Sequence, residues 1–522
     1  MNGLEIDYLV LLPALIPIAG MVLILVVDLV NPRLRQFPFA VAGLAAIGAS
    51  VATYPGLGLA RGDAQSTLCV ALGGGVTPGT PVPGVEGLPQ TCFWQADSLT
   101  SSLQLAAGIA TLVVVLLAWP RTRARSVTEG TREPIMAILL LTAFAGTMVV
   151  AASRDLGTWL IALELATLPV IGLIALSGRR GAIAGAVQLL VTSLVSFALL
   201  VLGAALWLVA TGSPMLDAGA ALAGEGYQTE APGAALVAWP DASTAILALS
   251  VVLLIAGLGF KLSLVPFHAW TPTAYSGATV PVATFLATVS KIAALAALLV
   301  VLRAVSVLGA SGLAAIALLA ALSMTVGNLM ALRQNDVVRL LAWSTVAQAG
   351  WVILPLVSVS SLGNRAASTY LLTYVIATTV AFAVVALMLR ERPGSGRTLD
   401  AYEGLWHRSP WRAGALALAL TSLAGLPPGI IGLVGKVVAL RPVVVEGWIW
   451  LAVIAAANAV LGVAVYLRWL RPVISTSAAT ETLKPTTRGP GSRRVIVVGL
   501  ALSSAVLVVV SVQPDVVLRL LG

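Results

Sequence analysis

Charged residues are scarce in this 522-residue chain: aspartate, glutamate, lysine and arginine together make up 10% of it. Together with 59% hydrophobic residues, this scarcity excludes a soluble globular protein, in which about a quarter of the residues are charged. Cysteine occurs only twice, at Cys69 and Cys92, which is too few for a metal site. Sequence motifs for NAD, flavin, haem, iron–sulfur or zinc binding are also lacking. We therefore expect no cofactor in this chain.

Long apolar runs occupy most of the sequence. Each run of 20 or more residues is long enough to cross a hydrocarbon core of about 30 Å as a helix. The sequence therefore predicts an all-α polytopic membrane protein embedded in a lipid bilayer. The acidic start and the length of the first apolar run do not fit a cleavable signal peptide. We expect about fourteen transmembrane helices, at residues 8–29, 38–59, 98–119, 134–152, 156–177, 182–211, 244–270, 280–308, 310–332, 338–358, 366–389, 411–440, 446–470 and 495–517.

The basic residues are distributed unevenly between the two sets of loops. Of the 30 lysines and arginines, 21 fall in one set, six fall in the other, and three lysines lie within spans. Basic loops remain on the inner side of a membrane, so we expect both termini on the outer side. The net charge of +9 is explained by these loops, and we expect no nucleic-acid partner. The six basic residues on the predicted outer side are Arg61, Arg154, Arg303, Arg365, Arg441 and Arg519.

Two long loops, 60–97 and 212–243, lie on the predicted outer side. The first contains both cysteines, and a Cys69–Cys92 disulfide can form if that compartment is oxidising. Neither loop has catalytic spacing, so we interpret both as variable coverings. On the inner side, residues 473–494 are polar and basic and resemble a flexible linker.

Four ionisable residues interrupt the predicted spans: Glu164, Lys261, Lys291 and Lys436. A lysine near the middle of a membrane costs roughly 2.5–3.5 kcal/mol on insertion scales, and four unpaired charges would cost on the order of 10 kcal/mol. They must therefore pair, be hydrated or lose their charge. A single locally neutralised charge with no role is a reasonable alternative for any one of them. One acid followed by three lysines, on four different spans, instead favours a path for protons.

Two of the lysines lie near prolines that must break a helix, because proline lacks an amide hydrogen. Pro266 follows Lys261, and Pro427 and Pro428 precede Lys436. Such a break is tolerated in a membrane only where it is buried in protein or lines a wet cavity. His268 lies in the first break, where it is a candidate for proton transfer or a partner for the freed carbonyl groups.

The broken spans are the seventh and the twelfth, and an offset of five spans reverses orientation. We therefore predict two inverted five-helix repeats, of the kind that place ion paths where broken helices meet. The predicted divisions are three N-terminal helices with an outer loop (1–133), the first repeat (134–308), the second repeat (309–472), and an inner linker with the last helix (473–522).

The broken seventh span carries a family resemblance. Its sequence, Gly259-Phe-Lys-Leu-Ser-Leu-Val-Pro-Phe-His-Ala-Trp-Thr-Pro272, resembles the corresponding helix of the antiporter-like, proton-translocating subunits of respiratory complex I, the NADH:quinone oxidoreductase. The segments 281–291, 327–344 and 422–427 resemble the same family, so the likeness covers most of spans 4–13. Lys291 favours the subunit N branch, because other branches tend to carry histidine there.

The resemblance implies roles for the residues that match. Glu164 corresponds to the fifth-helix acid at a subunit interface, and Lys261, Lys291 and Lys436 correspond to lysines of a central proton-transfer axis. His268 corresponds to the histidine of the helix break. The family also implies that NADH, FMN, iron–sulfur clusters and quinone are bound by partner subunits. Expected partners are other membrane subunits, especially neighbouring antiporter-like and small ones, in a bacterial cell membrane.

This chain departs from the family at two positions. Gly185–Gln188 stands where a lysine often begins the sixth helix, and Gln348 stands where the tenth helix commonly has a histidine. Two other functions are open from the sequence: a subunit of a multi-subunit cation/proton antiporter that also carries Na⁺, and a structural spacer that no longer transports. Four retained intramembrane charges argue against the spacer, because idle buried charge lowers stability.

Overall fold

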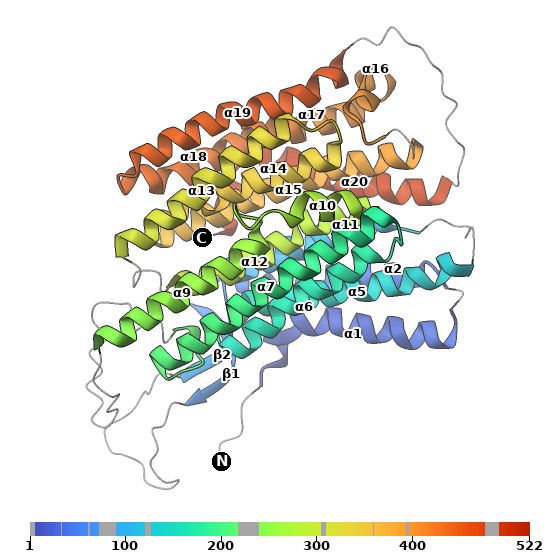
Figure 1. Cartoon of the computed structure of the whole chain (residues 1–522). Coiled ribbons are helices and arrows are strands. Elements are labelled where there is room, and N and C mark those ends of the chain that lie inside the picture. Colours follow the sequence, from blue (N-terminus) through green and yellow to red (C-terminus); the bar gives the residue numbers. More distant parts are fainter. Residues whose placement is uncertain are drawn as a thin grey trace.

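The computed structural model is a bundle of helices that run side by side (Figure 1). It describes residues 6–32, 34–60, 63–71, 90–120, 127–217, 240–303, 309–358, 360–392, 396–475 and 490–521. Within these residues, thirteen helices are long and apolar enough to cross a membrane. They match thirteen of the fourteen predicted spans, and the predicted span 411–440 is formed by two shorter helices. The all-α polytopic fold is thus confirmed.

The N-terminal part contains four helices and a small hairpin. Its elements are α1 (Tyr8–Val30), α2 (Phe37–Ala52), α3 (Tyr54–Leu57), β1 (Ala64–Ala71), β2 (Gln90–Asp97) and α4 (Ser98–Ala118). The two antiparallel strands were not predicted, because loop 60–97 lacks a clear alternation of apolar and polar residues. Cys69 lies opposite Cys92 in the strand register, and their sulfur atoms are bonded. Residues 72–89, between the strands, lie outside the described residues.

The next part of the chain holds the first interrupted helices. Its elements are α5 (Val127–Ala152), α6 (Leu156–Ala175), α7 (Arg180–Thr211), α9 (Pro240–Leu262), α10 (Trp270–Gly277), α11 (Val280–Ala287) and α12 (Val289–Val301). The predicted seventh span is therefore α9, a break and the start of α10. The predicted eighth span is also interrupted, at Thr288, where the backbone leaves the helical region (φ −121°, ψ −80°). Most of the predicted outer loop 212–243 lies outside the described residues.

The C-terminal part holds the second interrupted helix. Its elements are α13 (Gly309–Leu332), α14 (Val337–Ile353), η2 (Leu354–Val357), α15 (Ser361–Glu391), η3 (Leu399–Tyr402), α16 (Leu405–Arg408), α17 (Pro410–Ala424), α18 (Ile430–Val445), α19 (Ile449–Ile474), α20 (Pro490–Val512) and α21 (Asp515–Leu520). The break between α17 and α18 contains Pro427 and Pro428, as predicted. Residues 476–489 of the inner linker lie outside the described residues.

The first break begins with a tight turn at the end of α9. The amide of Leu264 donates to the carbonyl of Gly259 (2.9 Å), and the amide of Ser263 donates to that of Phe260 (3.2 Å). This pair of bonds is the Schellman motif, which places one residue in the left-handed region. Here that residue is Ser263 (φ 68°). A non-glycine residue in this conformation is strained, so its side chain is expected to have a specific use.

The second break begins with the same turn at the end of α17. The amide of Leu426 donates to the carbonyl of Thr421 (2.9 Å), and that of Gly425 donates to Ser422 (3.1 Å). Gly425 occupies the left-handed position (φ 78°), where a glycine has no steric penalty. The two broken helices therefore end alike, although their sequences differ.

A second correspondence joins the helices before the breaks. Asp155 caps α6 by accepting from the amide of Thr158 (2.8 Å), and Asp336 caps α14 by accepting from that of Arg339 (2.9 Å). Each capping residue also forms an isolated β-bridge. Asp155 pairs with Met215, which follows α7, and Asp336 pairs with Thr398, which follows α15. Such matched details are expected if the halves are inverted repeats, which remains a prediction.

Both ends of the described chain lie near the hairpin. The amide of Asp7 donates to Thr67 Oγ1 of β1 (2.8 Å). At the other end, Leu521 lines one cavity together with Leu59 and Ala60. These two ends of the described chain are thus on the same side of the bundle, as an even number of crossings requires.

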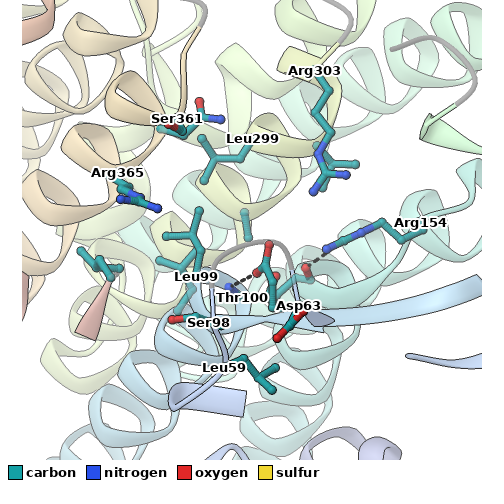
Figure 2. Close-up of a pocket in the computed structure, with 18 residues that line it drawn as sticks. Leu59, Asp63, Ser98, Leu99, Thr100, Arg154, Leu299, Arg303, Ser361 and Arg365 are labelled. Atoms are coloured by element: carbon teal, nitrogen blue, oxygen red, sulfur yellow. Dashed lines mark hydrogen bonds between the residues drawn. The ribbon is translucent and has the colours of Figure 1, made fainter. Parts of the chain in front are cut away.

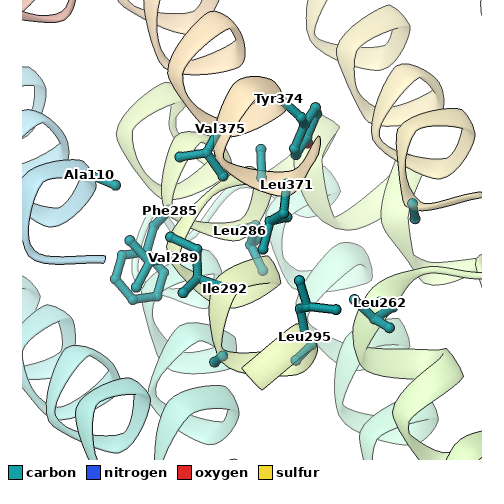
Figure 3. Packing of buried hydrophobic residues seen from close by; sticks show 14 of the residues in the cluster. Ala110, Leu262, Phe285, Leu286, Val289, Ile292, Leu295, Leu371, Tyr374 and Val375 are labelled. Atoms are coloured by element: carbon teal, nitrogen blue, oxygen red, sulfur yellow. The ribbon is translucent and has the colours of Figure 1, made fainter. Parts of the chain in front are cut away.

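Apolar side chains from several helices enclose the interrupted eighth span. Figure 3 shows Ile292 and Leu295 of α12 beside Leu371 and Val375 of α15, with Leu262 of α9 nearby. All of these side chains are buried. Because interiors are packed as densely as organic crystals, this layer fixes the position of the polar groups on the same helices.

Close helix packing at two glycines gives a test of the fold. A Cβ atom on Gly327 of α13 would lie 2.4 Å from the amide nitrogen of Ala347 on α14, and one on Gly146 of α5 would lie 2.4 Å from that of Ala166 on α6. We predict that Gly327→Ala destabilises the protein by about 1–3 kcal/mol, because overpacking moves backbone. Heating the membrane complex before native electrophoresis would show earlier loss of this chain. Gly414→Ala, whose Cβ would meet open space, is the control, and equal behaviour of the two variants would contradict the packing.

Candidate functional site

Glu164 of α6 and Lys261 of α9 form an ion pair. The Lys261 Nζ atom lies 2.6 Å from Glu164 Oε1 and also donates to Thr167 Oγ1 (3.0 Å) and Ser193 Oγ (3.4 Å). Lys261 is 8% exposed, and the Glu164 side chain is 13% exposed. Buried charges require partners and additional hydrogen bonds, and the two hydroxyl groups supply these for the lysine.

The side chain of Lys291, which belongs to α12, lies at the C-terminal end of the broken helix α9. Its Nζ atom donates to the carbonyl oxygen of Lys261 (2.8 Å) and to Ser263 Oγ (2.6 Å), and Thr271 donates to the same hydroxyl (2.7 Å). It also lies 4.9 Å from the ring centre of Trp270. The last carbonyls of a helix lack intrahelical partners and carry partial negative charge. The ammonium group thus caps α9, and the strained Ser263 provides one of its acceptors.

Lys436, which belongs to α18, has the same position at the second break, because its side chain lies at the C-terminal end of α17. Its Nζ atom donates to the carbonyl oxygen of Ala424, the last residue of α17 (2.5 Å), and lies 5.4 Å from the ring centre of Trp351. The residue is 6% exposed. Each broken helix therefore ends at a lysine ammonium that also faces a tryptophan ring. A cation over an aromatic face is favourable by about 0.5–2 kcal/mol.

A polar cluster on α14, α15 and α19 lies beside the second break. Gln348 donates to Tyr466 Oη (2.8 Å) and accepts from Tyr370, and Tyr466 is bonded to Ser344 (2.6 Å). Gln348 Nε2 is also 3.5 Å from the carbonyl oxygen of Leu423 in α17. The Tyr370 ring stacks on Trp351, which faces Lys436. Gln348 is thus the centre of the cluster, at the position where the family commonly has histidine.

Helix α14 connects this cluster with the first break, because it contacts α10 as well as α18. Thr345, one residue after Ser344, is hydrogen bonded to Tyr374 (2.9 Å). Tyr275 of α10 is fully buried, next to Trp270, and its hydroxyl lies within reach of Thr345, although no close hydrogen bond is formed among the described residues. Tyr275 and Thr345 therefore lie between the polar groups around Lys291 and those around Lys436.

His268 lies in the first break but apart from the four ionisable residues. Its ring centre is 5.3 Å from that of Trp343. Among the described hydrogen bonds and ion pairs, none joins it to Glu164 or to the lysines. Gln188, at the first of the two departures from the family, contacts the same break, since it donates to the carbonyl of Ala269 (3.0 Å).

Sequence reasoning missed the polar partners of the lysines. Ser263, Trp270 and Trp351 are each common in apolar spans, so their residue types alone gave no signal. Tyr466 was detectable in principle, because a tyrosine hydroxyl in an apolar span needs a buried partner. The side-chain partners of Lys261, Thr167 and Ser193, come from two other helices and depend on tertiary contacts.

A separate cavity of about 230 Å³ lies at the hairpin end of the bundle (Figure 2). Arg154, Arg303 and Arg365 line it, together with Asp63 and Asp97. Arg154 is 2% exposed, and burial, reinforced by the nearby Arg303, lowers its pKa to about 10. Three of the six basic residues on the predicted outer side thus gather in one place. None of the four intramembrane ionisable residues lines this cavity.

The site combines ionisable side chains with neutral hydrogen-bonding groups. Among the described residues, no group of three or more histidine, cysteine, aspartate or glutamate side chains is arranged to hold a metal ion. The site offers one carboxylate, three ammonium groups and a set of hydroxyl and amide groups, all within a helical bundle.

The sequence and the fold both match known proteins. Residues 153–462 match the family described as NADH:quinone oxidoreductase/Mrp antiporter, transmembrane. The chain is 36% identical over 484 residues to NADH-quinone oxidoreductase subunit N of Salinispora tropica, covering 90% of this chain and 86% of that protein.

Two solved structures extend the comparison. A chain of respiratory complex I from Thermus thermophilus with bound aureothin has 30% sequence identity and a TM-score of 0.72, covering 97% of this chain and 98% of that one. A chain of the Mrp complex from Dietzia sp. DQ12-45-1b has 20% identity and a TM-score of 0.75, with 99% and 96% covered, and shows the fold alone. The chain therefore belongs to the NADH:quinone oxidoreductase/Mrp antiporter transmembrane family, and within it to the group of NADH-quinone oxidoreductase subunit N.

Proposed function

We propose that this chain translocates protons as a membrane subunit of an NADH:quinone oxidoreductase. The supporting observation is that Lys291 and Lys436 each bind the end of a broken helix. Lys261, which is paired with Glu164, lies next to Lys291. The chain itself holds no redox centre in this proposal. NADH, FMN, iron–sulfur clusters and quinone belong to partner subunits, and their chemistry drives the proton transfer.

Charge coupling starts at Glu164. When a charge on a neighbouring subunit approaches or leaves this carboxylate, its attraction for Lys261 changes, and so does the affinity of that lysine for its proton. Lys291 accepts this proton as a neutral amine, after its own proton has been passed on toward Lys436; its Nζ atom lies at the Lys261 carbonyl and Ser263. Moving one proton against the membrane potential requires about 2.3 kcal/mol per 100 mV, which the change in a close ion pair can supply.

Transfer from Lys291 to Lys436 crosses the region of α14. Thr271 and Tyr275 lie on the Lys291 side, and Thr345, Tyr374 and Gln348 lie on the other. Hydroxyl groups both donate and accept, so they can pass a proton without storing it. Tyr275, whose buried hydroxyl lies within reach of Thr345 but forms no close hydrogen bond among the described residues, is the group whose small movement would join the two sides. We assign His268, which interacts with the backbone of Pro266 and contacts the Trp343 ring, to the freed backbone of the break and not to this route.

The surface beside Glu164 fits a neighbouring membrane subunit. Ile161 and Leu168, three residues before and four residues after Glu164 on α6, are 72% and 46% exposed. Residues at these spacings share one helix face, so the carboxylate borders an exposed apolar strip. We assign this strip to contact with an adjacent antiporter-like or small subunit. The chain lies in the bacterial cell membrane, with both termini on the outer side and the arginine-rich loops inside.

The first prediction concerns Lys436. Lys436→Met removes the last proton-exchanging group while keeping most of the length of the side chain, so we expect fewer protons translocated for each NADH oxidised. The ratio is measured in vesicles reconstituted with the complete complex. Arg441→Met, an exposed cation one turn further along α18, is the control and should leave the ratio unchanged. An unchanged ratio in Lys436→Met would favour a structural spacer.

The second prediction separates the hydroxyl of Ser263 from its backbone conformation. Ser263→Gly keeps the left-handed turn but removes one of the acceptors for Lys291, so we expect normal assembly with a lowered ratio of protons to NADH. Ser263→Ala should lower that ratio as well and should be less stable than the glycine variant by roughly 1 kcal/mol, because alanine keeps the left-handed strain that glycine relieves. Assembly is read by native electrophoresis. A full proton ratio in the glycine variant would remove Ser263 from the path.

The third prediction concerns the ion pair. Glu164→Gln and Lys261→Met each leave one buried partner uncompensated, which typically costs about 3–5 kcal/mol. The double variant removes both charges, so its loss of stability should be clearly smaller than the sum of the two. Thermal loss of this chain from the complex measures all three variants. Additive losses would mean that the two residues do not interact in the assembled complex.

A further inference from the structure

A second cavity lies at the end of the bundle opposite the hairpin. Helix α4 starts directly after β2 and runs to Ala118, which lines this cavity together with its neighbour Leu117. The cavity has a volume of about 480 Å³ and lies among the ends of α4, α7, α11, α14 and α15. On the predicted topology, this end is the inner side of the membrane.

Three arginines line the cavity: Arg179, Arg390 and Arg397. Among the described residues that line it, none is acidic. Each guanidinium also makes a fixed contact: Arg179 to the carbonyl of Gly277 (3.2 Å), Arg390 to that of Trp119 (2.6 Å), and Arg397 to that of Ser276 (3.0 Å). Arg397 is in addition paired with Asp336, which does not line the cavity (2.8 Å). Since an arginine has five N–H donors in a planar fork, a single carbonyl contact orients Arg179 and leaves it donors for a ligand, while Arg390 and Arg397 add positive charge to the cavity.

The start of α11 adds further donors. Thr279, Val280 and Pro281 line the cavity, and Thr279 is at the cap position but its side chain does not cap the helix. The first amides of a helix lack intrahelical acceptors, and this end carries partial positive charge. The Thr279 hydroxyl itself is buried without a hydrogen-bond partner among the described residues. The start of α11 and the three arginines are both suited to an anion.

Most of the remaining lining is apolar. Met136, Val280, Val338, Ala386 and Leu389 supply aliphatic surface next to the basic groups. Amphipathic, basic cavities between transmembrane helices on the inner side are suited to phospholipid headgroups. An anion without acyl chains would leave the apolar part of the cavity without a ligand group.

We propose that this cavity binds a phosphate group, and that its source is an anionic phospholipid of the inner leaflet. The phosphate lies between the arginines and the start of α11, and the acyl chains follow the apolar surface. Arg179 and Arg397 also hold the carbonyls at the end of α10, the half-helix after the first break. The lipid thus stabilises the corner between α10 and α11. The site does not depend on whether the lysines carry protons.

Native mass spectrometry of the purified complex tests the site. After partial removal of lipid, the complex is incubated with vesicles of phosphatidylglycerol, with vesicles of phosphatidylcholine, or with inorganic phosphate alone. We expect phosphatidylglycerol to remain bound to this chain and phosphatidylcholine to be lost. In Arg179→Gln/Arg390→Gln, retention should fall about tenfold or more, because each charge-assisted hydrogen bond contributes strongly. Arg339→Gln is the matched control, an exposed arginine at the start of α14 that does not line the cavity.

The outcomes separate the two sources of phosphate. Retention of phosphatidylglycerol that inorganic phosphate weakens but does not replace supports the lipid. A phosphate adduct that forms without lipid and is lost in the double variant supports the phosphate site but overturns its lipid source. Equal retention of both lipids, or equal retention by the double variant and Arg339→Gln, overturns the proposal. If the double variant does not assemble, the comparison of the three ligands on the unmodified complex decides alone.

Discussion

The structure depends on how backbone carbonyl groups are satisfied where two membrane helices break. In hydrocarbon, an unpaired carbonyl is costly and no water is at hand to bond it. This chain meets the requirement with lysine side chains, Lys291 at the end of α9 and Lys436 at the end of α17. The same contact also satisfies the lysines, because the negative end of a helix dipole favours a cation. Two groups that are each unfavourable in a membrane thereby stabilise one another.

Lys261 follows a different rule from the other two lysines. Its ammonium is paired with a carboxylate, whereas Lys291 binds a carbonyl oxygen, a hydroxyl and an aromatic face, and Lys436 binds a carbonyl oxygen and an aromatic face. In the proposed function, only Lys261 therefore responds directly to a charge that acts on Glu164. The other two respond there to the position of the half-helix that they cap. The three lysines are thus not equivalent steps in a series.

Much of this arrangement could be predicted from the sequence, because it follows from the cost of burying charge and from the chemistry of proline. The spans, the two breaks and the four ionisable residues were all evident in this way. The partners of the lysines were not, because they depend on which helices are neighbours. Ser263 shows the limit well: its residue type is ordinary, and only its left-handed backbone and its contact with Lys291 distinguish it. The helix interruption at Thr288 likewise could not be predicted, because neither proline nor glycine stands at this point of the sequence.

The lysine at each helix end has a mechanical consequence. In the proposed function, when Lys291 or Lys436 gives up its proton, the end of the half-helix loses the positive charge that held it, although the carbonyl itself has not changed. Conversely, any movement of the half-helix away from the lysine weakens the hold of that lysine on its proton. Protonation of the lysine and the position of the half-helix are then coupled equilibria. By thermodynamic reciprocity, a change imposed on either one shifts the other.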